Sequence, residues 1–389
     1  MHEGTVFYTI FLIFAGAAVF STLVLYTRQS LLVAYILLGA VIGPWGLKWI
    51  SDLGTVNDVG DVGIIFLLFL LGLHLQPQNL LHMLKKVTWI AMFSSLLFAV
   101  IAYFIGCWFG LSNIESMVLG AAMMFSSTII GLKLLPTTIL HHQHTGEVMI
   151  SVLLMQDIIA IVVLITINGA QDGSFSWHDL VLLAVALPSL ILFAFAFERY
   201  VLVKLLARFD RTQEYVFLLS IGWCLSMSLL AERIGLSQEV GAFVGGVALA
   251  SSPISLFIAE SLKPLRDFFL VMFFFSVGAT FNFSYASQVM IPACILAILM
   301  LVLKPLCFQM LLSKAGEKKS VAKEVGIRLG QASEFSLLLA SISISSGVIS
   351  DIAANLIQAT TILTFIVSSY VVVLKYPTPM SLSDSLRKD

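Results

Sequence analysis

The sequence predicts an all-α polytopic membrane protein, because its composition and patterning suit a lipid bilayer rather than water. Of its 389 residues, 59% are hydrophobic and only 11% are charged, whereas about a quarter of a soluble domain is charged. Apolar stretches of about 20 residues, the length that crosses a bilayer, recur along the chain, and we expect about thirteen transmembrane helices. The formal net charge of -1 gives no field that would attract nucleic acid.

Each expected helix is an apolar stretch bounded by polar or turn-forming residues. The first lacks the positive flank of a signal peptide, so we expect it to remain as a transmembrane helix. Three stretches (31–47, 60–75 and 236–250) are short and contain glycine, a pattern that transporter folds use near their binding sites. The expected spans are 5–26, 31–47, 60–75, 87–109, 114–134, 147–170, 179–197, 214–231, 236–250, 265–283, 288–312, 323–346 and 355–374.

The positions of lysine and arginine predict the orientation, since cytoplasmic loops are enriched in both. If the N-terminus is placed outside and the spans alternate, almost all of the 21 Lys and Arg residues fall on the inner side. Only Lys48 and Arg233 fall outside, and Lys304 and Arg328 lie within spans. We therefore expect residues 1–375 to form the membrane domain. Residues 376–389 should be a short cytoplasmic tail, with no regulatory nucleotide-binding domain.

Two spans are polar at their centres and lie seven spans apart. They are 114–134, which contains Met123–Gly131 "MMFSSTIIG", and 323–346, which contains Arg328–Ser336 "RLGQASEFS". An odd offset gives the two spans opposite directions, as corresponding members of an inverted repeat require. The pattern predicts inverted repeats with one polar, interrupted helix in each half.

Four charged residues stand out as candidates for the membrane interior, away from the outermost residues of their expected spans: Asp157, Lys304, Arg328 and Glu334. A charge at the bilayer centre costs about 2.5 to 3.5 kcal/mol on insertion scales, so such residues usually face a cavity and have a function. A carboxylate in a water-accessible cavity can hold either a proton or a small cation, but not both, and this competition is the basis of exchange. The alternative for Asp157 is a permanent ion pair that serves packing.

The residues beside these charges allow two interpretations each. The Gln156 amide oxygen can bind a cation without adding charge, or the amide can join two helices by hydrogen bonds. Ser126, Ser127 and Thr128 can face a cavity if their span unwinds, or they can bond back to their own helix. Both interpretations stay open here.

Lys304, Glu334 and Arg328 need partners in the core. Asp157 or Glu334 can supply the anion for Lys304, and a structural ion pair is the alternative. His141, His142 and His144 lie in an inner loop, "HHQH", where a solvated loop is favoured over a metal site. The sequence predicts no bound metal and no cofactor, apart from the transported ions.

Several motifs, in order along the chain, resemble the cation:proton antiporter-2 family. Within that family they resemble the membrane domain of the Kef-type glutathione-gated potassium-efflux antiporters. The motifs are "LLVAYILLGAVIGPWGL" (31–47), "VGIIFLLFLLGLHL" (62–75), "FSSTIIGLKLLP" (125–136), "LLMQDIIAI" (153–161), "EVGAFVGGVALASS" (239–252) and "RLGQASEF" (328–335).

The resemblance implies an NhaA-like antiporter fold, in which an ion-binding core moves against a dimerising scaffold. Two discontinuous helices would cross at mid-membrane, here spans 114–134 and 323–346. The family's ion-binding aspartate falls on Asp157, and a preceding glutamine, here Gln156, is typical of the potassium-transporting members. The hydroxyl ligands fall on Ser126, Ser127 and Thr128, and the core lysine falls on Lys304.

Two features depart from the family. The segment that matches the acidic regulatory loop, "AESLKPLRDFF" (259–269), is mixed in charge, so we do not expect glutathione gating. The family's Gly-Gly in the second crossing helix is replaced by Ala332-Ser333.

Together these features predict a secondary active antiporter, not an enzyme, that exchanges potassium for protons without net charge movement. A sodium/proton antiporter of the same family and a gated potassium-efflux channel are the alternatives. An intramembrane aspartyl protease using Asp157 and Glu334 fits less well, as does a receptor. We expect a homodimer in a bacterial inner membrane, with the N-terminus outside. A separate regulatory subunit is compatible with this prediction.

Overall fold

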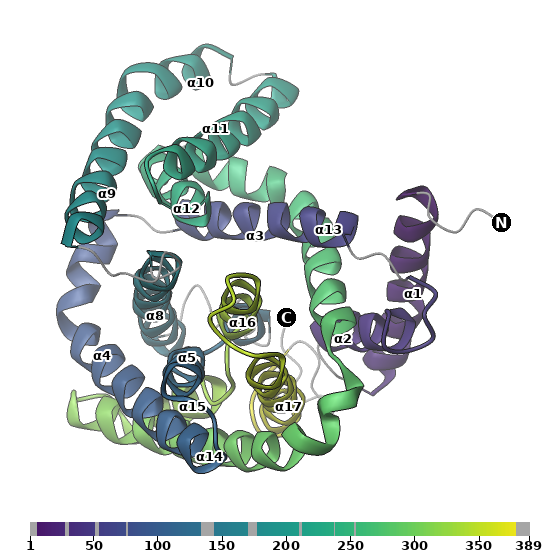
Figure 1. Cartoon of the computed structure of the whole chain (residues 1–389). Coiled ribbons are helices and arrows are strands. Elements are labelled where there is room, and N and C mark those ends of the chain that lie inside the picture. Colours follow the sequence, from purple (N-terminus) through teal and green to yellow (C-terminus); the bar gives the residue numbers. More distant parts are fainter. Residues whose placement is uncertain are drawn as a thin grey trace. The chain divides into compact units, whose positions relative to one another are not determined.

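The computed structural model describes residues 6–27, 31–50, 54–74, 77–133, 144–169, 177–209, 212–236, 238–252 and 254–378. Every regular element within these ranges is a helix (Figure 1), which confirms the predicted all-α class. The elements are α1 (Val6–Tyr26), α2 (Leu31–Ile42), α3 (Gly54–His74), α4 (Pro77–Trp108), α5 (Asn113–Met123), α6 (Thr128–Lys133), α8 (His144–Gly169), α9 (Trp177–Phe197), the π-helix η1 (Glu198–Leu202), α10 (Val203–Phe209), α11 (Gln213–Arg233), α12 (Gln238–Leu249), α13 (Ser255–Thr280), the 3₁₀ turn η2 (Phe283–Tyr285), α14 (Ala286–Lys314), α15 (Lys319–Arg328), α16 (Glu334–Ser345) and α17 (Asp351–Lys375).

Each predicted span coincides with one of these helices or, in two places, with a pair of half-helices. The span expected at 114–134 is interrupted at residues 124–127, between α5 and α6; we call this the first break. The span expected at 323–346 is interrupted at residues 329–333, between α15 and α16, and this is the second break. The interruption predicted for each half of the repeat is therefore confirmed.

By length and apolarity alone, five helices of the described part can cross a membrane. They are Val6–Tyr26, Val87–Trp108, Gln213–Arg233, Phe283–Lys314 and Asp351–Lys375. The same region holds shorter apolar helices, among them α2 and α16. These lengths suit an integral membrane protein whose remaining spans are short, broken or partly polar.

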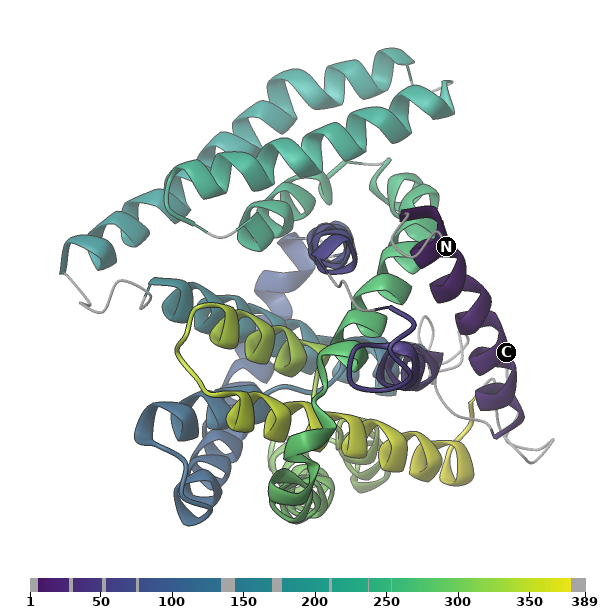
Figure 2. The same ribbon diagram turned by 45° about the vertical axis from the view of Figure 1, so that its right-hand side comes forward.

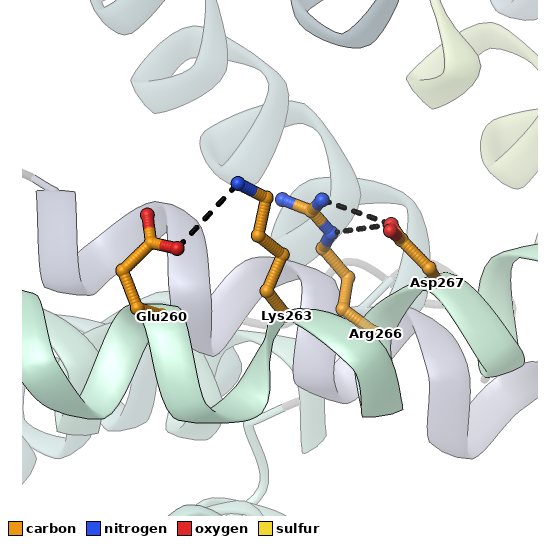
Figure 3. Close-up of polar contacts among 4 residues, drawn as sticks. All are labelled: Glu260, Lys263, Arg266 and Asp267. Carbon is orange, nitrogen blue, oxygen red and sulfur yellow. Dashed lines mark hydrogen bonds and ion pairs between the residues drawn. The ribbon is translucent and has the colours of Figure 1, made fainter.

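The start of α13 corrects the predicted span 265–283, because this helix already begins at Ser255 and runs through the whole of segment 259–269. Figure 3 shows the charged side chains of its first half. Lys263 pairs with Glu260 at 3.5 Å, an i,i+3 contact, and Arg266 pairs with Asp267 at 2.8 Å. Such side chains favour helix and pair along its surface, so a stretch that is too polar for the hydrocarbon still extends the helix beyond it.

The described chain forms two compact units. Unit 1 comprises Met1–Ser51, Met83–Leu164 and Val277–Asp389, so it contains both breaks. Within this unit, α16 packs against α5 and α17, and α14 packs against α15 and α17 (Figure 1). Figure 2 shows α16 and α17 side by side near the yellow end of the colour scale. The crossing of the two interrupted spans is thus built and surrounded by elements of a single unit.

Unit 2 comprises Asp52–His82 and Ile165–Ser276, and glycines let its helices approach closely. Helix α12 packs on both α3 and α11. A Cβ atom built at Gly246 would lie 2.1 Å from the Phe69 carbonyl oxygen of α3, and one at Gly241 would lie 2.2 Å from the Met227 carbonyl oxygen of α11. Small residues at helix interfaces serve this purpose in membranes, where backbone proximity supplies packing energy.

The close approach makes a testable prediction for Gly246→Ala. Its methyl group must push the α3 backbone away, at a cost of about 1–3 kcal/mol for an overpacked contact. The midpoint of thermal unfolding in detergent should therefore fall. Gly222→Ala is the matched control, because nothing lies within 4 Å of a Cβ at this α11 position. Equal midpoints for the two variants would contradict the packing of α12 on α3.

Candidate functional site

The two breaks lie against each other and share hydrogen bonds. The Ser126 hydroxyl in the first break donates to the Leu329 carbonyl oxygen in the second, at 2.8 Å. In the other direction, Gln331 Nε2 donates to the Ser127 carbonyl oxygen at 3.4 Å. Both contacts join residues more than 200 positions apart in the sequence. The crossing expected at mid-membrane is therefore a direct contact between two unwound segments.

Serine side chains cap the half-helices that leave the crossing. Ser127 Oγ accepts a hydrogen bond from the Ile130 N–H at the start of α6, at 3.0 Å. Ser333 Oγ accepts from the Phe335 N–H at 3.2 Å and starts α16. A glycine at position 333 would provide no such cap. The Ser333 side chain thus satisfies a backbone N–H that helix starts leave unpaired.

Gln156, on α8, uses both ends of its amide to close the first break. Its Oε1 accepts from the Ser126 N–H at 3.1 Å, and its Nε2 donates to the Met124 carbonyl oxygen at 3.3 Å. The side chain is fully buried. Of the two interpretations left open by the sequence, the helix-to-helix hydrogen bond is the one whose contacts are present; Oε1 keeps a second lone pair for other partners.

Asp157 follows on the same helix, and its carboxylate is also buried, at 1% exposure. The Thr128 hydroxyl lies 3.4 Å from Oδ1 and 3.2 Å from Oδ2 and can donate to either. Thr128 is the first residue of α6, where unpaired N–H groups carry partial positive charge. The carboxylate therefore sits in a polar but water-poor setting at the start of a half-helix.

Glu334 is the first residue of the other outgoing half-helix, α16, and is 4% exposed. Its carboxylate is close enough to that of Asp157 for the two to interact electrostatically. Two buried carboxyl groups that interact in this way repel each other when both are ionised. Binding a proton or a cation there relieves this repulsion.

Lys304, on α14, places its positive charge beside the ends of α5 and α15, the two half-helices that lead into the crossing. Its ammonium donates to the carbonyl oxygens of Phe125, at 2.6 Å, and Gln331, at 3.2 Å, so it binds both breaks at once. The nitrogen also lies 5.3 Å from the centre of the Phe98 ring. These carbonyls follow the ends of α5 and α15, where partial negative charge accumulates. Among the described residues, no ion pair joins Lys304 to Asp157 or Glu334.

Arg328 lies at the end of α15, with its side chain 1% exposed. Its guanidinium pairs with Glu324 at 2.9 Å and donates to the Pro377 carbonyl oxygen at 2.9 Å. It also lies over the Tyr376 ring, at 5.4 Å. The structure thus brings Arg328 to the chain that leaves α17. Residues 379–389 of the expected tail lie outside the described residues.

The histidine loop gives no metal centre in the described part of the chain, where no group of three or more His, Cys, Asp or Glu side chains could hold a metal ion. His141 and His142 lie outside the described residues. His144 starts α8, and its Nε2 lies 2.6 Å from Glu317 Oε2.

Three residues at the crossing escaped the sequence analysis: Gln331, Thr364 and Ser368. Gln331 Oε1 accepts from the Ser368 hydroxyl at 2.9 Å, and the Thr364 hydroxyl accepts from the Ala332 N–H at 3.0 Å. Thr364 and Ser368 both lie on α17, four residues apart and hence on one face. Polar residues recurring at this spacing in an apolar span were the signal that could have identified Thr364 and Ser368.

Comparison with known proteins connects this geometry to a family. The chain matches the transmembrane sodium/hydrogen exchanger family over residues 10–374. It is 29% identical to K(+) efflux antiporter 5 of Arabidopsis thaliana, over 96% of this chain and 66% of that protein. It is 26% identical to the glutathione-regulated potassium-efflux system protein KefC of Klebsiella aerogenes, over 78% of this chain and 50% of that protein. The chain thus spans about half to two thirds of the length of these relatives.

A solved structure shares the fold. The sodium proton antiporter MjNhaP1 of Methanocaldococcus jannaschii superposes with a TM-score of 0.72 and covers 98% of this chain and 97% of its own, at 17% identity. The expected antiporter fold is therefore confirmed.

The contacts of Gln156 predict the effect of Gln156→Met, which keeps the volume but removes both hydrogen bonds. Leaving buried backbone groups unpaired costs about 1–3 kcal/mol, so the first break should open more often. Hydrogen exchange at the Ser126 amide, measured by mass spectrometry, should accelerate, and the unfolding midpoint should fall.

Gln358→Met is the matched control for this test. The Gln358 side chain is also buried, but among the described residues its Oε1 has no hydrogen-bond partner and its Nε2 has only a 3.5 Å contact to Thr280. Unchanged exchange at Ser126 in Gln156→Met would show that the amide does not hold the break.

Proposed function

Because the chain belongs to the transmembrane sodium/hydrogen exchanger family, we propose that it is a secondary active antiporter that exchanges potassium for protons. The observation that carries the proposal is the buried Asp157 carboxylate at the crossing of two interrupted helices. Its side chain is 1% exposed, and Lys304, the cation at this crossing, binds carbonyl groups and not this carboxylate. Asp157 is thus left with a negative charge that a proton or a metal cation can neutralise.

In this mechanism the two ligands compete for the same carboxylate. On one side of the membrane Asp157 releases its proton and takes up the cation, and on the other side the exchange is reversed. Thr128 is the nearest supporting ligand, because its hydroxyl already contacts both Asp157 oxygens. A buried charge is costly without compensation, so the site should favour the states in which Asp157 is loaded.

Ser126, Ser127 and Gln156 can complete the coordination without leaving their present contacts. The Ser126 hydroxyl donates its hydrogen to Leu329 and keeps its lone pairs. Ser127 Oγ and Gln156 Oε1 each accept one backbone N–H and retain a second lone pair. We propose these oxygens as cation ligands, with Glu334 tuning the charge of the site.

The choice of potassium is supported by the relatives, which are named as potassium-efflux proteins. Sodium is the alternative. The sodium antiporter of similar structure shares only 17% identity with this chain, so its likeness concerns the fold and not the ion.

We further propose that exchange moves no net charge and that the protein works as a homodimer in a bacterial inner membrane, with the N-terminus outside. Gln156 cannot titrate, so Asp157 is the evident proton carrier, and one proton then moves against one cation. Unit 1, which contains the breaks, is the proposed moving core. If native mass spectrometry finds a monomer and the same preparation transports at the full rate, the dimer would be removed from this proposal.

Asp157→Asn should abolish coupled exchange, because the amide keeps the size of the side chain but cannot release a proton. The measurement is potassium-driven proton movement in proteoliposomes, reported by an internal pH dye. Asp157→Glu, which still titrates, should retain partial activity.

Asp351→Asn is the control, since Asp351 is an exposed carboxylate at the start of α17 in the same unit. It should exchange like the wild type. Substantial exchange by a folded Asp157→Asn protein would overturn the proposed function.

A further inference from the structure

Helix α17 presents a row of buried hydroxyl groups that the proposed mechanism has not used. Two of them donate only to carbonyl oxygens of their own helix in the described structure: Thr360 to Leu356 and Thr361 to Ile357, both at 2.8 Å. Thr364 and Ser368 differ, because both reach the second break. The buried hydroxyl residues are Thr360, Thr361, Thr364, Ser368 and Ser369.

One peptide group in the second break is held from both sides. The C=O of Gln331 and the N–H of Ala332 belong to the same planar unit, and in a trans peptide they point in opposite directions. Lys304 donates to that C=O at 3.2 Å, while Thr364 Oγ1 accepts from that N–H at 3.0 Å. The orientation of the carbonyl that Lys304 binds is therefore fixed by Thr364.

The Thr364 hydroxyl is itself fixed as an acceptor. It donates its single hydrogen to the Thr361 carbonyl oxygen of its own helix, at 2.8 Å. Only lone pairs remain for Ala332. The chain of contacts from the ammonium through the peptide to the hydroxyl polarises in one direction, which strengthens each hydrogen bond.

Ser368 fixes the Gln331 side chain in the same manner. Its hydroxyl donates to Gln331 Oε1 at 2.9 Å, so the amide nitrogen must face the other way. That nitrogen donates to the Ser127 carbonyl oxygen in the first break, at 3.4 Å. If the amide were flipped, Gln331 Oε1 would lie against the Ser127 carbonyl oxygen, and the two oxygens would repel each other. By holding Oε1 on its own side, Ser368 thus helps to determine how the second break binds the first.

We infer that Thr364 is a positioning residue for ion exchange, which acts by orienting the 331–332 peptide so that Lys304 stays on carbonyl groups and away from Asp157. Ser368 supports it through the Gln331 side chain. This inference rests on the proposed function, in which Asp157 must be free to bind its cation. When the peptide loses its anchor, the ammonium loses one of its two carbonyls and becomes available to pair with the carboxylate. It then competes with the cation for the site.

The test compares Thr364→Val, Thr364→Ser and Thr360→Val in proteoliposomes, as cation KM and maximal rate. Valine matches threonine in shape but cannot accept from Ala332. Thr364→Val should raise the cation KM about ten-fold, which corresponds to about 1.4 kcal/mol. Its maximal rate should change less than about two-fold, because the ammonium competes with the cation for binding and does not alter the later steps. Thr364→Ser keeps the hydroxyl and should restore a near-normal KM.

Thr360→Val is the matched control, since it removes a buried hydroxyl of the same helix that bonds only within that helix in the described structure. Its KM should stay near that of the wild type. Ser368→Ala should raise KM in the same direction by a smaller factor, and it provides the test if Thr364→Val does not fold.

Equal KM values for Thr364→Val and Thr360→Val would overturn the inference. If Thr364→Val does not fold, equal KM values for Ser368→Ala and the wild type would overturn it. The proposed function would survive that result as long as Asp157→Asn remains inactive. Conversely, exchange by Asp157→Asn would remove the proposed function whatever the Thr364 variants show.

Discussion

The structure depends on one constraint: two membrane helices are interrupted, and every backbone group freed by the interruptions needs a partner where water is scarce. Side chains from three other helices meet part of this need. Gln156 of α8 binds Met124 and Ser126 of the first break. Lys304 of α14 binds a carbonyl of each break. Thr364 of α17 accepts the Ala332 N–H. The crossing is therefore a polar centre fixed by its surroundings, which allows it to stay unwound without unfolding.

The same interruptions place negative and positive side chains at different helix ends. Both half-helices that begin at the crossing have a carboxylate near their first residue, Asp157 beside α6 and Glu334 in α16, where partial positive charge is exposed. Both half-helices that end there lead into carbonyls bound by Lys304. The cost of burying the ammonium is thus offset mainly by backbone dipoles. This leaves the Asp157 carboxylate without an ion pair to Lys304, and the proposed exchange site requires such a state.

Much of this could be predicted from the sequence, since membrane spans follow from local apolarity. The two polar centres at Met123–Gly131 and Arg328–Ser336 located both breaks, and the cost of an intramembrane charge identified Asp157 and Lys304. The start of α13 was placed at residue 265 and not at Ser255, because charge excludes a segment from hydrocarbon but not from a helix. The polar residues Thr364 and Ser368 could have been noticed from their spacing in an apolar span, but their partners could not be predicted. Those partners are set by tertiary contacts, as is the contact of Gln331 with Ser127, 204 positions apart. The sequence likewise could not decide between the two interpretations of Gln156, since both need the same amide.

The central claim is that Asp157 alone carries the exchanged charge while Lys304 remains on its carbonyls. The most direct test is the pH change in wild-type proteoliposomes that are clamped at zero and then at about 100 mV, with equal chemical gradients; such a potential contributes about 2.3 kcal/mol per net charge moved. The account predicts the same rate and the same final pH gradient at both potentials. A final gradient that shifts with the clamped potential would contradict it and would assign a second moving proton to Lys304 or Glu334.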